Sequence, residues 1–226
     1  MEENAILKTL ERMNEGLAGF FWDAFTAVAV NGVSGDYVEF GSWGCNTLRH
    51  AFHACEQFRA GRRLWAFDSF QALPPTDEPR DQHPVLASGG AGQGGVEAFH
   101  AACADFGVPR DAYTAVEGYY QDTLPPLGAD GEPRDIAIAY VDCNLYSSTV
   151  TVLEFLAPRL KPGMIVGFDD YYLYNRDSGV SGEREALSEL LQDNPQWHFQ
   201  RFKDIHWGGV SFVVEHSDTG AHRRPL

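Results

Sequence analysis

The fold is decided by the stretch Tyr37-Val-Glu-Phe-Gly-Ser-Trp-Gly-Cys-Asn-Thr47. Its first five residues predict a short buried strand, and the small or polar residues that follow open a segment, 48–59, with helical spacing of apolar positions. Toward the N-terminus, residues 4–30 carry apolar side chains at spacings of three and four. This pattern predicts an amphipathic helix, or two in sequence, ahead of the first strand.

The same alternation of apolar runs and helical segments continues to the end of the chain. Further strands are predicted over 64–68, 113–117, 136–142, 164–169, 198–203 and 209–215, and further helices over 96–106, 148–160 and 183–192. Continuously apolar strands separated by helices indicate a parallel sheet covered on both faces. The last two strands lie close together in the sequence and predict an antiparallel pair. We therefore expect a doubly wound α/β fold with a seven-stranded, mostly parallel sheet and an antiparallel last strand.

The length and composition favour one large domain. The chain has 226 residues, of which 44% are hydrophobic, and this is enough for a substantial core. We expect an N-terminal helical segment, 1–34, packed on the core, a main domain over 35–215, and a polar, flexible tail over 216–226. Self-association through an apolar face of the N-terminal helix, giving a homo-oligomer, is the alternative to packing on its own sheet.

The net charge of −15 excludes several classes of partner. Such an acidic chain opposes binding to nucleic acid and to anionic membrane surfaces. The apolar stretch Leu17–Val30 is too short to span a membrane and contains Asp23. The four cysteines show no metal-binding spacing, and the start Met-Glu-Glu differs from the basic start of a signal peptide. These features predict a cytoplasmic protein with reduced thiols.

Acidic residues fall at the carboxyl ends of successive predicted strands. In chain order they are Glu39, Asp68, Glu117, Asp142 and the pair Asp169-Asp170. Open parallel sheets bind ligands in the crevice beyond these strand ends. A single acid here is commonly a solvated loop residue, but acids on five consecutive strand ends predict a common site.

The first turn has the form acid-x-Gly-x-x-Gly, with Glu39, Gly41 and Gly44. Small residues let the backbone approach a ligand, and the following helix presents free N–H groups. A nicotinamide-binding turn is expected to carry a third glycine, which is missing here, and this argues against an oxidoreductase. Asp68 follows Gly44 at the distance where a carboxylate accepts both hydroxyls of a ribose.

A second group of acids joins Asp142 with Asp169 and Asp170. Carboxylates on neighbouring strand ends repel one another unless they are protonated or bridged by a cation, and oxygen ligands of this kind favour Mg²⁺. Such a metal can hold a substrate hydroxyl and lower its pKa. The alternative is that one aspartate caps the segment that follows it.

Five ordered blocks of this sequence resemble one family. They are Gly35-Asp-Tyr-Val-Glu-Phe-Gly-Ser-Trp43, Ala66-Phe-Asp-Ser-Phe-Gln-Ala-Leu-Pro74, Glu117-Gly-Tyr-Tyr-Gln-Asp-Thr-Leu-Pro125, Val141-Asp-Cys-Asn-Leu-Tyr-Ser-Ser-Thr149 and Leu160-Lys-Pro-Gly-Met-Ile-Val-Gly-Phe-Asp-Asp-Tyr171. Together they resemble the TylF-like macrocin O-methyltransferases, which methylate small molecules and have the class I methyltransferase fold. The resemblance implies O-methylation of a sugar hydroxyl in a natural product, with S-adenosylmethionine as the methyl donor.

The resemblance also implies roles for individual residues. It assigns to the cofactor the first turn with its helix start, the end of the second strand, the third strand end and Asp142. These cofactor residues are Glu39, Gly41, Ser42, Gly44, Thr47, Asp68, Ser69, Glu117, Gly118, Tyr119 and Asp142. It assigns Mg²⁺ to Asp142, Asp169 and Asp170.

One position departs from the family pattern. The family motif is Asp-x-Asp-Leu-Tyr, whose second aspartate is a candidate general base, whereas this chain has Asp142-Cys-Asn144-Leu-Tyr146. A neutral amide cannot take the proton. Metal activation of the acceptor, His206 as the base, and an acceptor that needs little deprotonation are three open interpretations, with Asp142, Asn144 and His206 as candidate catalytic residues. A different nucleophile without metal, or an inactive cofactor-binding module that acts through a partner, are the alternative functions. The long loop 71–95 is either a lid over the cofactor or tolerated surface.

Overall fold

The structure is a computed structural model that describes residues 3–58, 61–82, 94–173, 179 and 181–217, with side chains from residue 5 onward. Seven strands form one sheet in the order β3-β2-β1-β4-β5-β7-β6. The strands are β1 (Asp36–Phe40), β2 (Leu64–Asp68), β3 (Tyr113–Glu117), β4 (Ile136–Val141), β5 (Ile165–Phe168), β6 (Trp197–Asp204) and β7 (Val210–His216). Only β7 runs against the others, pairing antiparallel with both β5 and β6. The predicted doubly wound fold is confirmed.

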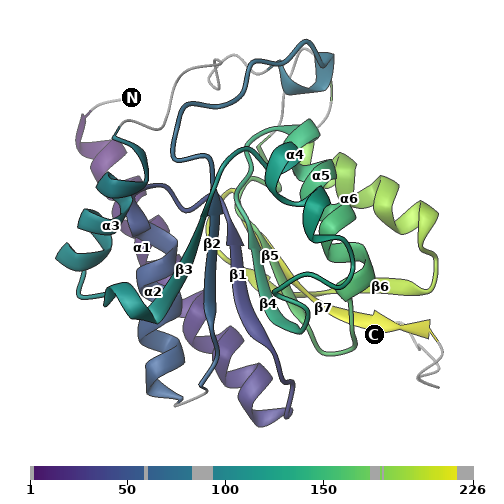
Figure 1. Ribbon diagram of the computed structural model, residues 1–226, viewed down its shortest axis with the longest axis horizontal. Coiled ribbons are helices and arrows are strands. Elements are labelled where there is room, and N and C mark those ends of the chain that lie inside the picture. Colours follow the sequence, from purple (N-terminus) through teal and green to yellow (C-terminus); the bar gives the residue numbers. More distant parts are fainter. Residues whose placement is uncertain (1–2, 59–60, 83–93, 174–178, 180, 218–226) are drawn as a thin grey trace.

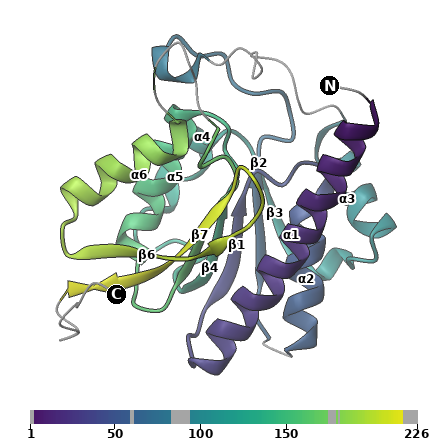
Figure 2. The same cartoon turned by 180° about the vertical axis from the view of Figure 1, so that it is seen from behind.

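Helices cover both faces of this sheet. Figure 1 shows α1 (Glu3–Val30), α2 (Asn46–Gln57) and α3 (Gly95–Asp105) on one side and α4 (Tyr120–Thr123), α5 (Tyr146–Leu156) and α6 (Gly182–Asp193) on the other. Figure 2 shows the same arrangement from behind, with α1 running diagonally across the sheet. The N-terminal segment is one continuous helix, so the possibility of two helices in sequence is wrong. Among the helices of the described residues, none is long and apolar enough to cross a membrane.

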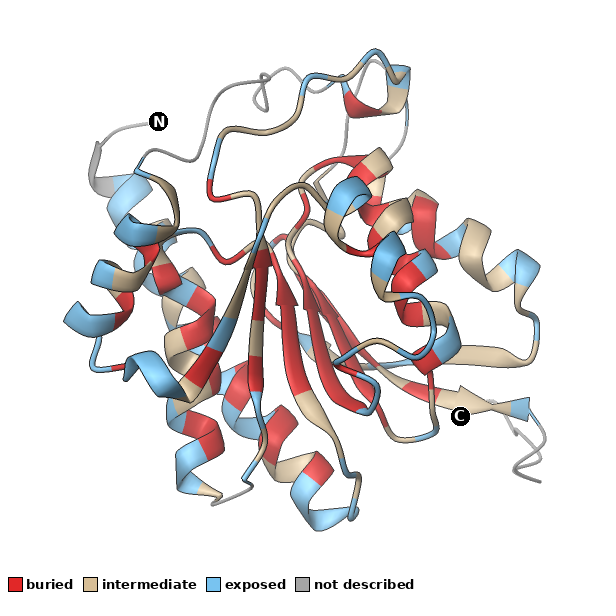
Figure 3. Cartoon of the chain, viewed as in Figure 1, coloured by how far each residue is buried: buried red, intermediate tan, exposed pale blue. Residues whose placement is uncertain are grey.

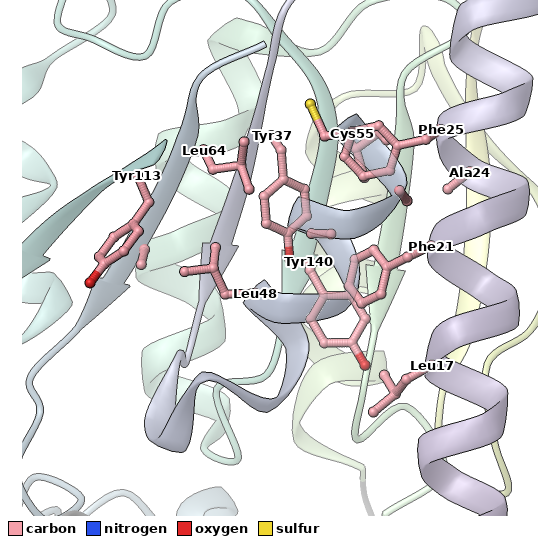
Figure 4. Packing of buried hydrophobic residues seen from close by; sticks show 14 of the residues in the cluster. Leu17, Phe21, Ala24, Phe25, Tyr37, Leu48, Cys55, Leu64, Tyr113 and Tyr140 are labelled. Atoms are coloured by element: carbon pink, nitrogen blue, oxygen red, sulfur yellow. The ribbon is translucent and has the colours of Figure 1, made fainter. Parts of the chain in front are cut away.

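The core lies on both faces of the sheet, whose central strands are buried along most of their length (Figure 3). On one face α1 places Phe20, Phe21 and Phe25 against the tyrosines of the sheet, and all three are fully buried. Figure 4 shows Phe21 and Phe25 pointing from α1 toward Tyr37 and Tyr140. Burial of each such ring contributes about 1.5–3 kcal/mol, which fixes α1 to the sheet.

Several element ends differ from their predicted positions by one to four residues, and the largest difference is at the helix predicted over 148–160, which ends at Leu156. Gly41, Asp142 and Asp169 each come directly after a strand, although their backbone N–H groups still donate to Phe67, Phe40 and Val141 of the neighbouring strands. The last strand extends to His216, one residue into the predicted tail, and residues 218–226 lie outside the described part. The order of the sheet brings the ends of β1 and β4 side by side, and the strand order reverses between them.

Candidate functional site

A cavity of about 880 Å³ opens beyond the carboxyl ends of β1, β2, β4 and β5. Most of the residues predicted for a site lie along it. Those that line it are Gly41, Gly44, Thr47, Asp68, Ser69, Tyr119, Asp142, Asn144 and Asp169. Six predicted residues do not line it: Glu39, Ser42, Glu117, Gly118, Asp170 and His206.

Asp68 fastens the first turn to the end of β2. Its Oδ2 accepts hydrogen bonds from the backbone N–H groups of Ser42 (2.8 Å) and Trp43 (3.1 Å), and its Oδ1 accepts one from Phe70 (2.7 Å). Burial raises the pKa of Asp68, while these three hydrogen bonds lower it. Oδ1 accepts the Phe70 N–H with one lone pair, and a carboxylate oxygen has a second one that can accept a hydroxyl from a ligand in the cavity.

Glu39 lies beneath the first turn instead of bordering the cavity. It is fully buried, and its Oε2 accepts a hydrogen bond from the Tyr37 hydroxyl at 2.6 Å. The Oε1 atom is also buried and has no hydrogen-bond partner among the described residues. Burial raises the pKa of Glu39 to about 7. The strand alternation explains this position, since Glu39 and Tyr37 point to the same face, the face that α1 covers.

Glu39 is expected to make the stability depend on pH. A carboxyl whose pKa is raised by folding stabilises the protein at low pH, and this contribution is lost as the pH rises from about 4.5 to 7. The loss is on the order of 3 kcal/mol. The variant Glu39→Gln keeps an acceptor for Tyr37 and cannot ionise, so its free energy of unfolding should fall less between about pH 5 and 8.

Urea denaturation at a series of pH values measures this difference. Glu117→Gln is the matched control, because Glu117 ends β3 of the same sheet and is exposed. If the free energy of unfolding changes with pH in the same way in the wild type and in Glu39→Gln, Glu39 does not titrate in this pH range.

Asp142 and Asn144 form the opposite wall of the cavity. Asp142 follows β4, and burial raises its pKa well above the ordinary value, with the charges of Asp169, Asp170, Glu183 and Asp68 adding to the effect. The Asn144 amide lies 3.5 Å from Asp142 Oδ1. Asn144 has a φ of 60°, a left-handed conformation that asparagine adopts more readily than most residues. This conformation keeps the amide beside the carboxylate.

Asp169 is held from behind by two side chains. Its Oδ1 accepts hydrogen bonds from the Tyr140 hydroxyl and, at 2.9 Å, from His206 Nε2. His206 Nδ1 in turn accepts a hydrogen bond from the Gly208 backbone N–H at 3.1 Å, which places the ring proton on Nε2. The His206 side chain is only 3% exposed. Both ring nitrogens are therefore engaged away from the cavity, and the geometry makes His206 a residue that orients Asp169 and not a base for the acceptor.

Asp170 lies behind the cavity beside a buried glutamate that sequence reasoning missed. Glu183, in the first turn of α6, is 1% exposed, and its Oε2 accepts a hydrogen bond from the Asp170 backbone N–H at 2.8 Å. Burial raises the pKa of Asp170 to about 7 and that of Glu183 well above its ordinary value. Asp170 Oδ2 and Glu183 Oε1 are buried without a partner in the described part. No sequence signal marks Glu183, because acids are common in the first turn of any helix.

The N-terminal helix supplies a third wall that the sequence analysis did not predict. Leu10, Met13, Asn14 and Leu17 of α1 line the cavity. Asn14 Oδ1 accepts hydrogen bonds from Arg49 and His50 of α2, which attaches α1 at this point. A polar Asn14 inside the apolar periodicity of 4–30 is the one signal that could have indicated a special position.

The beginning of the long loop is anchored over the cavity. Leu73 and Pro74 line the cavity, and the Tyr119 hydroxyl donates to the Ala72 carbonyl at 3.2 Å. Asp81 is buried, and its carboxylate accepts hydrogen bonds from the backbone N–H (3.0 Å) and hydroxyl (2.6 Å) of Ser147 in α5. Residues 71–82 are therefore held against the site. Of the rest of the predicted loop 71–95, residues 83–93 lie outside the described residues and Gly95 begins α3.

The family model of macrocin-O-methyltransferase (TylF) matches residues 13–186. The chain belongs to this family. Two curated relatives of this chain are the "8-demethyl-8-(2,3-dimethoxy-alpha-L-rhamnosyl)-tetracenomycin-C 4'-O-methyltransferase" of Streptomyces olivaceus and the "Mycinamicin III 3''-O-methyltransferase" of Micromonospora griseorubida. The first is 34% identical over 64% of this chain and 56% of its own length. The second is 28% identical over 74% and 69%. The chain thus spans just over half of the first relative.

Solved structures show the same fold as this TylF-family chain. The O-methyltransferase NovP superposes with a TM-score of 0.69 at 23% identity, covering 88% of this chain and 79% of NovP. The apo structure of CalS11, titled a TDP-rhamnose 3'-O-methyltransferase, gives a TM-score of 0.56 at 26% identity, covering 85% and 76%. The family and the fold expected from the five sequence blocks are both confirmed.

Proposed function

We propose that this protein transfers the methyl group of S-adenosylmethionine to a hydroxyl oxygen of a small molecule, and that the acceptor is a sugar hydroxyl of a natural product. The observation that carries the proposal is a single cavity with two chemically different walls. One wall is the glycine turn with Asp68, which suits an adenosyl cofactor, and the other carries Asp142, Asn144 and Asp169. The named activities of the relatives support the same reaction class.

The reaction asks the protein mainly to align two reactants. A hydroxyl oxygen attacks the methyl carbon in line with the carbon–sulfur bond, which breaks and leaves the demethylated cofactor. The hydroxyl proton must leave during this displacement. We assign it to Asp142, because this carboxylate borders the cavity beside Asn144. Asn144 donates a hydrogen bond and orients the acceptor.

Mg²⁺ forms part of the proposal, held by Asp142, Asp169 and Asp170. Within the described residues, no group of three His, Cys, Asp or Glu side chains is arranged closely enough to hold a metal ion. The chemistry of the donors nevertheless fits a divalent cation, since these are half-buried carboxylates and Asp170 Oδ2 has no hydrogen-bond partner in the part of the chain that the structure describes. A bound Mg²⁺ supplies Lewis acidity that lowers the pKa of a hydroxyl beside it.

Calorimetric titration with S-adenosylmethionine and with its demethylated product tests the cofactor assignment. Binding of both is expected. If neither S-adenosylmethionine nor its demethylated product gives heat, the methyltransferase assignment is wrong. Repeating the titration with MgCl2 in the wild type and in Asp170→Asn tests the metal. Identical isotherms in all four conditions would remove Mg²⁺ from the proposal and leave the cofactor in place.

The variant Asp142→Asn is expected to bind the demethylated cofactor normally and to lose transfer by about 100-fold, the usual effect of removing a proton acceptor. The amide keeps the shape of the carboxylate but cannot take the proton. Transfer is measured with 4-nitrophenyl α-L-rhamnoside, and Asp111→Asn, an exposed acid, is the matched control. Full activity of Asp142→Asn would assign the proton elsewhere.

A binding module without catalysis is the second candidate, because Asn144 replaces the acid of the family motif. It predicts cofactor binding without transfer to any glycoside by the wild type. In that case Asn144→Asp should restore transfer.

A further inference from the structure

A second hollow of about 660 Å³ lies beside the main cavity, between α1 and the turn that joins β6 to β7. We name it the α1–hairpin pocket and define it by Thr9, Arg12 and Met13 of α1 together with Tyr172, His206 and Trp207. Met13 borders both hollows. The two hollows therefore adjoin each other at Met13.

Backbone contacts build this pocket. A Cβ on Gly16 would lie 2.1 Å from the Ile205 carbonyl oxygen, so α1 touches the β6–β7 turn directly at this point. Arg12 and Met13 lie one helical turn closer to the N-terminus on the same face, and side chains on a helix lean in that direction. Opposite them, the Tyr172 backbone N–H donates to the Gly208 carbonyl at 2.8 Å, which places Tyr172 beside the turn that carries Trp207.

The surface of the pocket combines exposed aromatic rings with positive charge. Trp207 is 63% exposed and Tyr172 is 38% exposed. Exposed aromatic side chains that gather at a hollow often mark a site where a ligand or partner binds. Arg12 and Arg201 also line the pocket, with Asp204 paired to Arg201. Two guanidinium groups here contrast with the net charge of −15 for the whole chain.

The pocket is also connected to the acceptor wall. His206 lines it and donates through Nε2 to Asp169, which lines the main cavity. We take a molecule whose hydroxyl lies beside Asp142 and Asp169 to extend past Met13, the residue that both hollows share, into the α1–hairpin pocket. The apolar wall made by Met13 suits a part of that molecule without polar groups.

We infer that the α1–hairpin pocket binds the aglycone of the acceptor, a planar aromatic ring system that stacks on Trp207 and directs acidic oxygens such as phenols toward Arg12. This inference rests on the proposed function, because it takes the sugar of the same glycoside to lie in the main cavity. It identifies the acceptor class as aryl glycosides. Simple alkyl glycosides are the poorer acceptors.

The test compares 4-nitrophenyl α-L-rhamnoside with methyl α-L-rhamnoside, using full-length protein loaded with cofactor. We expect the wild type to have the lower KM for the aryl glycoside, and Trp207→Ala to raise that KM about tenfold with kcat unchanged, as expected for removal of one stacking ring. The KM for the methyl glycoside should not change. Trp22→Ala is the matched control, since Trp22 is also exposed on the α1 side but lies outside both hollows.

An equilibrium measurement keeps the inference testable without turnover. The 4-nitrophenyl group quenches indole fluorescence, so titrating the aryl glycoside into protein loaded with demethylated cofactor should quench the wild type more strongly than Trp207→Ala, which keeps Trp43 in the main cavity. Equal KM ratios, or equal quenching, in wild type and Trp207→Ala would overturn the inference. A change of oligomeric state in Trp207→Ala by gel filtration would also overturn it, because the pocket would then be a contact between chains. If the inference fails but the protein still binds the cofactor, the proposed function stands.

Discussion

Replacing Gly41 with alanine is expected to abolish cofactor binding and to lower the melting temperature by about 6–12 °C, which corresponds to about 3 kcal/mol for a chain of this size. A Cβ at this position would lie 2.0 Å from the Asp142 carbonyl oxygen. The backbone of Gly41 also has a φ of +98°, which side chains of other residues disfavour. Both walls of the cavity meet here, so the change displaces the glycine turn and Asp142 together.

Gly44→Ala is the matched control for this prediction. Gly44 has a φ of +68°, but a Cβ there meets nothing within 4 Å. The variant is expected to lose only about 1–2 kcal/mol, the cost of the left-handed conformation. Differential scanning calorimetry compares the stability of the two variants, and titration with the demethylated cofactor measures the loss of binding by Gly41→Ala. Equal losses of stability in the two variants would show that the close contact between Gly41 and Asp142 is not important.

Gly16→Ala is expected to lower the free energy of unfolding by about 2–3 kcal/mol, because the added methyl group collides with backbone that cannot move aside. The Ile205 carbonyl oxygen would lie 2.1 Å from the new Cβ and the His206 Cβ 3.5 Å from it. Since α1 lines the main cavity through Leu10, Met13 and Leu17, moving α1 should also weaken cofactor or acceptor binding.

Gly19→Ala gives the opposite expectation on the same helix. The nearest atom to its Cβ is the Lys203 Nζ at 4.0 Å, the far end of a flexible side chain. Alanine favours the helix over glycine by about 1 kcal/mol, so this variant should be slightly more stable than the wild type. Urea denaturation measures the free energy of unfolding of Gly16→Ala and of Gly19→Ala. Stabilisation by Gly16→Ala would contradict the described packing of α1 on the β6–β7 turn.

Local patterns predicted the elements of this fold because each element depends on a short stretch of chain. The apolar runs at 64–68 and 113–117 are strands with the predicted bounds. The strands predicted over 136–142 and 164–169 end one residue earlier, at Val141 and Phe168. The next residues, Asp142 and Asp169, still donate backbone hydrogen bonds to the sheet. Periodicity does not distinguish these residues from strand residues.

The sequence by itself determined the family, the order of strands and helices, and the gathering of acids at one edge of the sheet. The family follows from the resemblance of the five sequence blocks, the order of the elements from periodicity, and the common edge of the acids from the rule that parallel strands share one carboxyl edge. Only the tertiary structure decided that Glu39 is buried beneath the turn, that His206 orients Asp169, and that α1 forms a wall of the cavity. These three outcomes depend on contacts between segments far apart in the chain, such as α1 with the β6–β7 turn, and on the direction of side chains in irregular turns. Neither leaves a periodic signal in the sequence.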